Sequence, residues 1–171
     1  MRVIFEGPDL VGKSTLVSLV AAKLGMPIRG RITRVGPSQV LFANAEDFAQ
    51  NPNSVLDRCY WLSDLVYEPI NTGNASVCAK PPVYQLLAKD EHSIYVYVTA
   101  SDEVLRERMK TRGDELLNIE QIITASHRYD DFFFNVNMKY LLTVDTSSTN
   151  VDENVERITN YIQEVINNAT N

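Results

Sequence analysis

A glycine-rich segment near the start of the chain contains residue types that bind phosphate. Residues 7–15 read Gly-Pro-Asp-Leu-Val-Gly-Lys-Ser-Thr, which fits G-x-x-x-x-G-K-[ST] at every position. Gly7 and Gly12 permit a tight turn that brings backbone N–H groups close to phosphate oxygens. Lys13 adds a positive charge, and the hydroxyl of Ser14 is suited to bind Mg²⁺. The segment therefore predicts a phosphate-binding loop, or P-loop, for a nucleoside triphosphate.

The flanking residues support this interpretation over a chance match to the motif. An apolar run at residues 3–5 precedes the loop, and a segment with helical apolar spacing follows it. A helix that begins near Lys13 would direct the positive end of its dipole at a bound anion. We expect ATP and Mg²⁺ as ligands. The loop residues expected to contact ATP are Gly7, Asp9, Val11, Gly12, Lys13, Ser14 and Thr15.

Charged residues at two further points could complete a phosphate site. A short apolar strand is predicted to end in Asp57 and Arg58, and ligands of open α/β sheets lie beyond the carboxyl ends of the strands. In the helix predicted over 102–112, Arg108 and Arg112 are four residues apart and share a face. We expect both arginines to point toward the site; a solvent-exposed basic face is the alternative.

The remaining pattern predicts the elements that position these residues. Strands are predicted over 2–6, 54–58, 94–98 and 140–144, and a strand with its exit loop over 28–37. Helices are predicted over 13–24, 38–50, 82–89, 102–112, 116–134 and 151–166. Residues 68–80, which include Pro69 and Gly73, are predicted to form a loop. Strands that alternate with helices specify an α/β fold, here a five-stranded parallel sheet with helices on both faces.

Length and composition limit the classes of function. A chain of 171 residues that is 44% hydrophobic is predicted to form one domain over 1–171. A net charge of −6 argues against nucleic acid or an anionic membrane as a partner, and no apolar run is long enough to span a bilayer. Cys59 and Cys78 lack C-x-x-C spacing, so we expect reduced thiols in a cytoplasmic protein.

Four parts of the sequence resemble thymidylate kinases. Residues 5–15 are similar to that family's P-loop, F-E-G-x-D-x-x-G-K-S/T. The other similar parts are Asp57-Arg58 with Ser63 and Tyr67 downstream, the stretch 103–121, which resembles the arginine-bearing lid and places a small lid around 106–118, and Val144-Asp145, which resembles the adenine-side loop. The resemblance covers most of the chain in outline and implies a P-loop nucleoside monophosphate kinase architecture.

The resemblance also implies an activity and residue roles. The activity is transfer of the ATP γ-phosphoryl group to a (deoxy)nucleoside monophosphate, with dTMP or a related dNMP as acceptor. The resemblance implicates Arg58, Arg108 and Arg112 in catalysis and places Asp145 on the ATP side. With Lys13 of the P-loop these arginines form the expected catalytic set, and we expect Ser14, and indirectly Asp57, to hold the metal. The residues expected to bind the substrate are Asp9, Arg34, Asp57, Arg58, Trp61 and Tyr67. Trp61 and Tyr67 could stack on a base, and a place in the core is the alternative for each.

Two other functions stay open at this stage. A deoxynucleoside kinase transfers to a 5′-hydroxyl and benefits from a carboxylate base, for which Glu6 and Asp57 are candidates. Segment 28–37 holds three arginines and no carboxylate, which favours a monophosphate acceptor. A P-loop regulatory module that binds ATP without transfer is the third interpretation. The acceptor's base and sugar, a homodimer of the kind common in the family, and a viral source are left as hypotheses.

Overall fold

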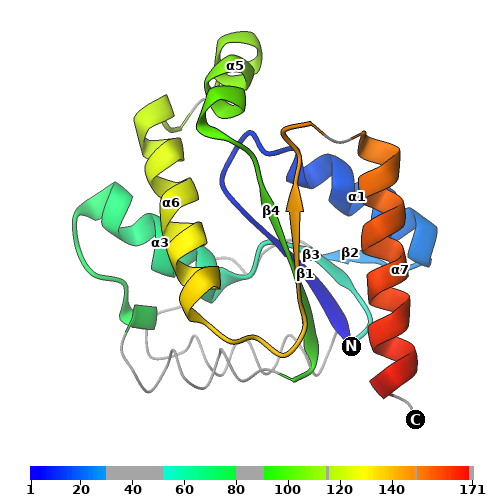
Figure 1. The fold of residues 1–171 in the computed structure, drawn as a ribbon. Coiled ribbons are helices and arrows are strands. Elements are labelled where there is room, and N and C mark those ends of the chain that lie inside the picture. The colour runs from blue at the N-terminus through cyan, green and yellow to red at the C-terminus, as the bar shows by residue number, and fades with distance from the viewer. Residues whose placement is uncertain (30–51, 80–90, 115, 149, 170–171) are drawn as a thin grey trace.

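The computed structural model describes residues 1–29, 52–79, 91–114, 116–148 and 150–169. Five parallel strands form one sheet in the order β2-β3-β1-β4-β5 (Figure 1). The strands are β1 (Arg2–Glu6), β2 (Ile28–Arg29), β3 (Val55–Asp57), β4 (Ser93–Thr99) and β5 (Leu141–Asp145). The predicted five-stranded parallel sheet is therefore confirmed. The helices predicted over 38–50 and 82–89 lie outside the described residues.

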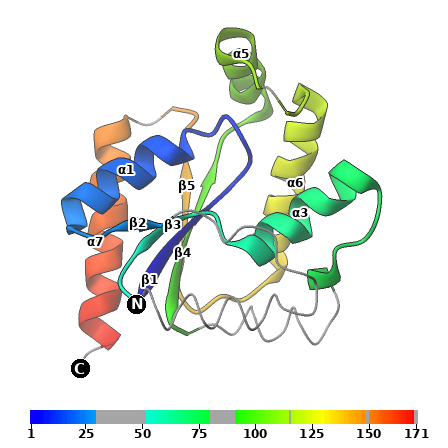
Figure 2. The ribbon, with the colours of Figure 1, turned by 180° about the vertical axis from the view of Figure 1, so that it is seen from behind.

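Helices cover both faces of the sheet, as predicted. The helical elements are α1 (Lys13–Leu24), α3 (Tyr60–Thr72), the 3₁₀ turn η2 (Val77–Ala79), α5 (Asp102–Arg112), α6 (Ile119–Asn135) and α7 (Val151–Ala169). Helices α1 and α7 lie together on one face, and α3 and α6 lie on the other (Figures 1 and 2). Helix α5 stands beyond the end of the sheet to which β1 and β4 run (Figure 1).

The apolar strands β1 and β4 form the centre of two hydrophobic clusters. Side chains alternate between the faces of a strand, so Val3 and Phe5 pack toward α1 and α7, whereas Ile4 packs toward α3 and α6. In β4, the residues Tyr95 and Tyr97 join the α3–α6 cluster. All of these side chains are buried. Burial on both faces explains why the strands are continuously apolar rather than alternating.

The loop predicted over 68–80 is wrong at its beginning, because α3 continues through Pro69 to Thr72. A proline inside a helix lacks the N–H group that would bond the carbonyl four residues earlier, here that of Leu65. Arg128 of α6 supplies the missing donor: its Nη2 donates to the Leu65 carbonyl oxygen at 3.3 Å. A tertiary contact thus stabilises a helix that the local sequence predicts to stop.

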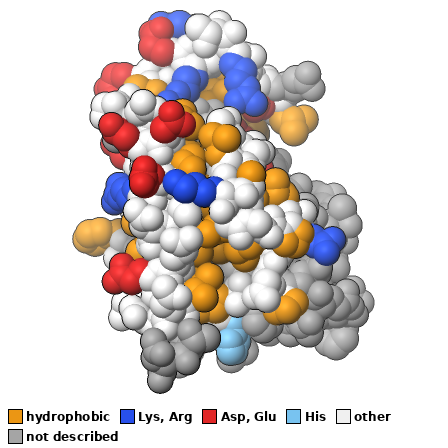
Figure 3. Space-filling view, turned by 90° about the vertical axis from the view of Figure 1, so that its right-hand side faces the viewer, with side chains coloured by type: hydrophobic (Ala, Val, Ile, Leu, Met, Phe, Trp, Pro, Cys, Tyr) orange, Lys and Arg blue, Asp and Glu red, His pale blue; other side chains and the backbone are white. Residues whose placement is uncertain are grey.

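The surface carries charges of both signs. Acidic and basic side chains are interspersed among those coloured on the face in Figure 3, with orange apolar side chains between them. Among the helices that the structure describes, none is both long and apolar enough to cross a membrane. Cys59 and Cys78 are free and buried.

Candidate functional site

The loop between β1 and α1 has the backbone that the glycine motif predicts. Gly7 has φ +146°, and a Cβ at this position would collide with the carbonyl oxygen of Val98. Gly12 adopts a left-handed conformation at φ +83° and caps the N-terminus of α1. Positive φ favours glycine at both positions, and at Gly7 there is in addition no space for a side chain. The turn delivers Lys13 and Ser14 to the first turn of α1.

Lys13 and Ser14 both contact Asp57 at the carboxyl end of β3. The Lys13 Nζ lies 3.7 Å from Asp57 Oδ1, and the Ser14 hydroxyl donates to Asp57 Oδ2 at 2.8 Å. The Lys13 side chain is only 7% exposed. Burial, together with the positive charge of Arg58, lowers the pKa of Lys13 to about 8, although nearby carboxylates oppose the shift. The ammonium group is therefore poised to gain from an incoming anion.

Asp57 and Ser14 fit the requirements of a Mg²⁺ site. The buried Asp57 Oδ1 accepts no hydrogen bond from the residues that the structure describes. Mg²⁺ prefers oxygen ligands and is held in phosphoryl-transfer sites by one or two protein groups with water and substrate phosphates. The carboxylate of Asp57 and the hydroxyl of Ser14 could hold the ion in this way.

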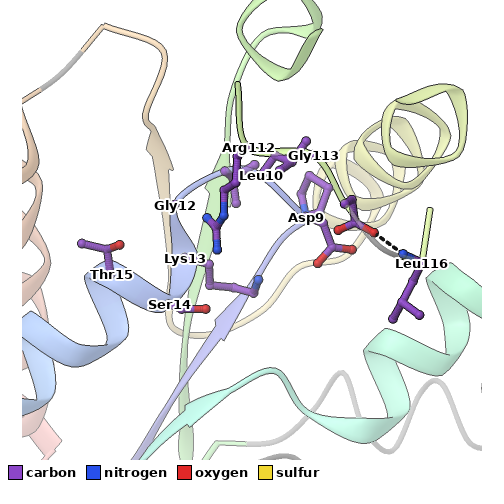
Figure 4. Close-up of a pocket in the computed structure, with 12 residues that line it drawn as sticks. Asp9, Leu10, Gly12, Lys13, Ser14, Thr15, Arg112, Gly113 and Leu116 are labelled. Atoms are coloured by element: carbon purple, nitrogen blue, oxygen red, sulfur yellow. Dashed lines mark hydrogen bonds between the residues drawn. The ribbon is translucent and has the colours of Figure 1, made fainter. Parts of the chain in front are cut away.

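Two adjoining cavities open over the P-loop. The first lobe, of about 580 Å³, is lined by Pro8, Asp9, Leu10, Val11, Gly12, Lys13, Ser14, Thr15, Arg112, Gly113, Asp114 and Leu116 (Figure 4). The second lobe, of about 650 Å³, is lined by Asp9, Lys13, Ser14, Asp57, Arg58, Tyr67, Asn71, Asp114, Leu116 and Leu117. The two lobes share part of the P-loop wall, including Lys13 and Ser14. Two ligands could therefore meet at these residues.

A fixed positive charge lies on the wall of the second lobe. The Arg58 Nη2 donates to Asp9 Oδ1 at 2.6 Å, and the Arg58 Cζ lies 4.9 Å from the centroid of the Tyr67 ring. The Tyr67 hydroxyl in turn donates to Asp9 Oδ2 at 3.0 Å. These contacts bring together Asp9, Arg58 and Tyr67, three residues predicted to bind the substrate. A guanidinium held in this way is a ready partner for a phosphate.

The backbone of Arg58 is unusual, since its φ is +72°. A non-glycine residue in this region carries strain of about 1–3 kcal/mol. The Arg58 N–H donates to the Phe5 carbonyl at 2.9 Å, and the next N–H, of Cys59, donates to Glu6 Oε1 at 2.6 Å. The second carboxylate oxygen of Glu6 accepts a hydrogen bond from the Tyr129 hydroxyl at 2.9 Å. These hydrogen bonds join the carboxyl end of β1 to the residues that follow β3 at the site.

Glu6 itself does not face either lobe. Its side chain is fully buried, and burial raises the pKa of its carboxyl group, against the opposing charge of Arg58. Both oxygens are already engaged by protein donors. The hypothesis that Glu6 serves as a catalytic base for a hydroxyl acceptor is therefore wrong in this structure.

The arginines of α5 differ from one another in orientation. Arg112 lines the first lobe, as predicted, and Figure 4 shows its side chain directed toward the P-loop beside Lys13. Arg106 points away from the lobes and pairs with Glu120 of α6, with 2.7 Å between Nη1 and Oε1. Only Arg112 of the two therefore presents its charge to the cavity.

The prediction that Arg108 points into the site requires correction. Its Nη1 donates to the Leu10 carbonyl at 3.0 Å and to the Thr146 hydroxyl at 3.1 Å, and its Nη2 donates to the Thr146 carbonyl at 2.8 Å. The side chain thus joins the P-loop to the loop after β5. Carbonyl groups at loop ends need donors, a need that the spacing of Arg108 and Arg112 in the sequence cannot reveal.

The prediction that Trp61 contacts a base also requires correction. Trp61 is 1% exposed and packs edge-on against Tyr95 of β4 and Phe132 of α6, with ring centroids 6.4 Å and 5.6 Å away. Its position on the inner face of α3 places it in the core, whereas Tyr67 lies on the face that lines the second lobe. The alternative of core packing is correct for Trp61.

Two other predicted residues are engaged by loop contacts, and of the two only Val11 lines a cavity, the first lobe. Asp145 ends β5, and its Oδ1 accepts a hydrogen bond from the Ser147 N–H at 2.8 Å; it lines neither lobe. Val11 is fully buried, and its carbonyl accepts a hydrogen bond from the Thr146 hydroxyl at 2.9 Å. Arg34 lies outside the described residues.

Several cavity residues are absent from the sequence prediction. Asn71 lines the second lobe. Because a loop is predicted over 68–80, the sequence does not place Asn71 on α3. The Asp114 carboxylate accepts hydrogen bonds from the N–H groups of Leu116 and Leu117, both at 2.8 Å. This turn brings both leucines to the second lobe, and Leu116 is 90% exposed there. For Asp114, Leu116 and Leu117, the only sequence signal is their position in the lid predicted around 106–118.

Comparison with known proteins places the fold. No protein-family model matches the chain. The SPbeta prophage-derived uncharacterized protein YorR of Bacillus subtilis (strain 168) is 26% identical over 155 residues, which cover 88% of this chain and 92% of YorR. The crystal structure of YorR in complex with phosphorylated GDP aligns with a TM-score of 0.77 at 24% identity, over 95% of this chain and 96% of YorR.

Two further kinases share the architecture. A structure of deoxyadenosine kinase from M. mycoides with dCMP and dCDP aligns with a TM-score of 0.66 at 18% identity, over 96% of this chain and 100% of that chain. A gluconokinase from Sinorhizobium meliloti 1021 aligns with a TM-score of 0.62 at 14% identity, over 99% and 95%. The chain has a P-loop kinase fold. At these identities the likeness concerns the fold alone, so the narrower resemblance to thymidylate kinases stays a prediction.

Proposed function

We propose that the chain is a nucleotide kinase that transfers the γ-phosphoryl group of ATP to a deoxynucleoside monophosphate, with dTMP as the first candidate. One observation carries the proposal: the two lobes meet at Lys13 and Ser14, and the second lobe has Arg58 in its wall. Two phosphate groups bound in this arrangement would lie end to end. Phosphoryl transfer depends on such positioning and on charge neutralisation more than on covalent catalysis.

The first lobe supplies the groups that ATP requires. Backbone N–H groups of the P-loop and the Lys13 ammonium would bind the β- and γ-phosphates. Mg²⁺, when held by Ser14 and Asp57, would neutralise charge on the phosphate oxygens. Arg112, which reaches this lobe from the lid, would stabilise the charge that spreads over the transferred group. Arg108 would act indirectly, by fixing the shape of the P-loop.

The second lobe supplies the groups for a phosphorylated acceptor. Arg58 would bind the acceptor phosphate, which is already ionised and needs no base to attack. Asp9 holds Arg58 with one oxygen and the Tyr67 hydroxyl with the other, and the remaining lone pairs of its carboxylate could accept from a sugar hydroxyl. Tyr67 and Asn71 would then lie toward the nucleoside.

The direct test is ATP consumption against a panel of deoxynucleoside monophosphates, ribonucleoside monophosphates and free nucleosides, with Mg²⁺ and with the metal chelated. We expect turnover with a deoxynucleoside monophosphate and none after chelation. Lys13→Ala should abolish transfer while the thermal transition remains. ATP hydrolysis that no acceptor changes would instead indicate the regulatory module, and near-normal turnover of Lys13→Ala would exclude the assigned P-loop role.

A deoxynucleoside kinase is the second candidate, because carboxylates are present where a hydroxyl acceptor would need a base. Asp9, Asp57 and Asp114 line the second lobe, and the deoxyadenosine kinase of M. mycoides shares the fold. All three carboxylates have partners: Arg58, Ser14 and the lid backbone respectively. Faster transfer to deoxyadenosine than to dAMP or dTMP in the panel would favour this candidate.

A further inference from the structure

Glu6 is an acidic residue that the cavities do not account for. It ends β1, has no exposed surface and lines neither lobe. A carboxylate is costly to bury unless hydrogen bonds and charges compensate it. Its two donors come from separate parts of the fold, the Cys59 N–H before α3 and the Tyr129 hydroxyl of α6. These contacts indicate a specific role rather than simple packing.

The contacts of Glu6 bear directly on the backbone of Arg58. Consecutive residues of β1 bind consecutive residues after β3, since the Phe5 carbonyl accepts from Arg58 N–H at 2.9 Å and Glu6 accepts from Cys59 N–H at 2.6 Å. Arg58 therefore has a hydrogen bond on each side of its strained φ of +72°. The Phe5 bond uses the main chain, so Glu6 supplies the one side-chain contact of this pair.

We propose that Glu6 is a positioning residue that holds Arg58 in its left-handed conformation and thereby aims the guanidinium at the second lobe. A side chain at φ +72° leaves the backbone in a direction that ordinary negative φ values do not give. Without the bond to Cys59, Arg58 can relax to negative φ and turn away from Asp9 and Tyr67. The inference deepens the proposed function, on which it depends for the meaning of Arg58 as an acceptor ligand.

The test compares Glu6→Ala with Glu6→Gln in the full-length chain, with KM measured separately for ATP and for dTMP. Glutamine retains an oxygen that can accept from Cys59, and the Tyr129 hydroxyl can rotate to accept from its amide. We expect Glu6→Ala to raise the KM for dTMP by about tenfold or more and the KM for ATP by less than about threefold. Glu6→Gln should restore most of the acceptor affinity.

A second variant and a control guard against simple loss of folding. Tyr129→Phe removes one donor to Glu6 at nearly constant volume and should raise the KM for dTMP by a smaller factor. Val3→Ala is the matched control, because Val3 is equally buried in β1 but lies on the opposite face. It should lower the melting temperature without separating the two KM values.

Three kinetic results would overturn the inference: equal increases of both KM values in folded Glu6→Ala, a Glu6→Gln variant as impaired as Glu6→Ala, or Tyr129→Phe that raises only the KM for ATP. A crystal structure of Glu6→Ala gives a readout that needs no activity. Arg58 should there adopt negative φ and leave Asp9; an unchanged Arg58 would refute the positioning role. If the wild-type chain phosphorylates no acceptor, the proposed function fails, while this structural comparison still decides the role of Glu6.

Discussion

Raising the pH should weaken ATP use through one residue, Lys13. Its side chain is 7% exposed, and burial beside the charge of Arg58 lowers its pKa from 10.5 to about 8. ATP binds the protonated form, so kcat/KM for ATP should fall above pH 8 and be about tenfold lower at pH 9 than its plateau, approaching tenfold per further pH unit. Burial keeps the pKa of the neighbouring Tyr67 above its usual range, so Tyr67 does not titrate in this window.

The stability of the fold should move in the opposite direction. Between about pH 8 and 10.5 the unfolded chain retains a proton on Lys13 that the folded chain has released. Because the unfolded state then binds more protons, the free energy of unfolding rises with pH through this group, by about 3 kcal/mol at most. A fall in kcat/KM over this range therefore cannot be attributed to Lys13-driven unfolding.

The assay is a pH series of kcat/KM for ATP at saturating acceptor, with thermal melting measured in the same buffers. Lys13→Arg is the matched control, since a guanidinium stays charged throughout the range. Its profile, whatever its absolute rate, should lack the alkaline fall. A wild-type profile that stays flat to pH 10, or an identical fall in Lys13→Arg, would refute the assignment of a depressed Lys13 pKa to ATP binding.

Five substitutions test the rest of the site. Arg58→Ala should raise the acceptor KM by roughly 10–100-fold, because a charged hydrogen bond is lost, and should change ATP affinity little. Arg106→Ala removes an equal charge outside the lobes and should change neither the acceptor KM nor the ATP affinity. Equal losses in the two variants would contradict both assignments. Arg112→Ala should lower kcat by about tenfold or more in single-turnover measurements, and an unchanged kcat would remove it from the site. Gly7→Ala should destabilise the fold by about 3 kcal/mol or more in denaturant titrations, and an unchanged free energy of unfolding would contradict the collision with the Val98 carbonyl. Trp61→Phe should lower the melting temperature but leave the acceptor KM unchanged; a selective rise in that KM would return Trp61 to the substrate site.

The sequence predicts best what is decided locally. The P-loop conformation depends on Gly7 and Gly12, whose positive φ values belong to the motif itself, and β1 and β4 reveal their double-sided burial by being continuously apolar. The location of Arg58 in the site follows from its position directly after β3, a strand that ends at the site. These features need no knowledge of distant contacts.

Features that depend on contacts between distant elements could not be predicted from the sequence. Arg108 and Arg112 have equal standing on one helix, yet carbonyl groups of two loops engage only Arg108. Trp61 and Tyr67 lie on one helix, and only packing against β4 and α6 decides which of them is buried. Asn71 lies in the part of α3 that follows Pro69, where the proline by itself predicts that the helix has already ended. In each case a partner far along the chain determines the outcome.

The presence of Pro69 in α3 and the hydrogen bond from Arg128 together limit which substitutions the protein tolerates at these two positions. Because the proline leaves the Leu65 carbonyl without a helical donor and Arg128 supplies one from α6, neither position is independent of the other. Pro69→Ala would return a local donor to that carbonyl and make Arg128 replaceable, whereas Arg128→Met alone would strand the oxygen. In a double-mutant cycle, Arg128→Met should therefore lower the stability of the wild-type chain but have little effect on stability once Pro69→Ala is present.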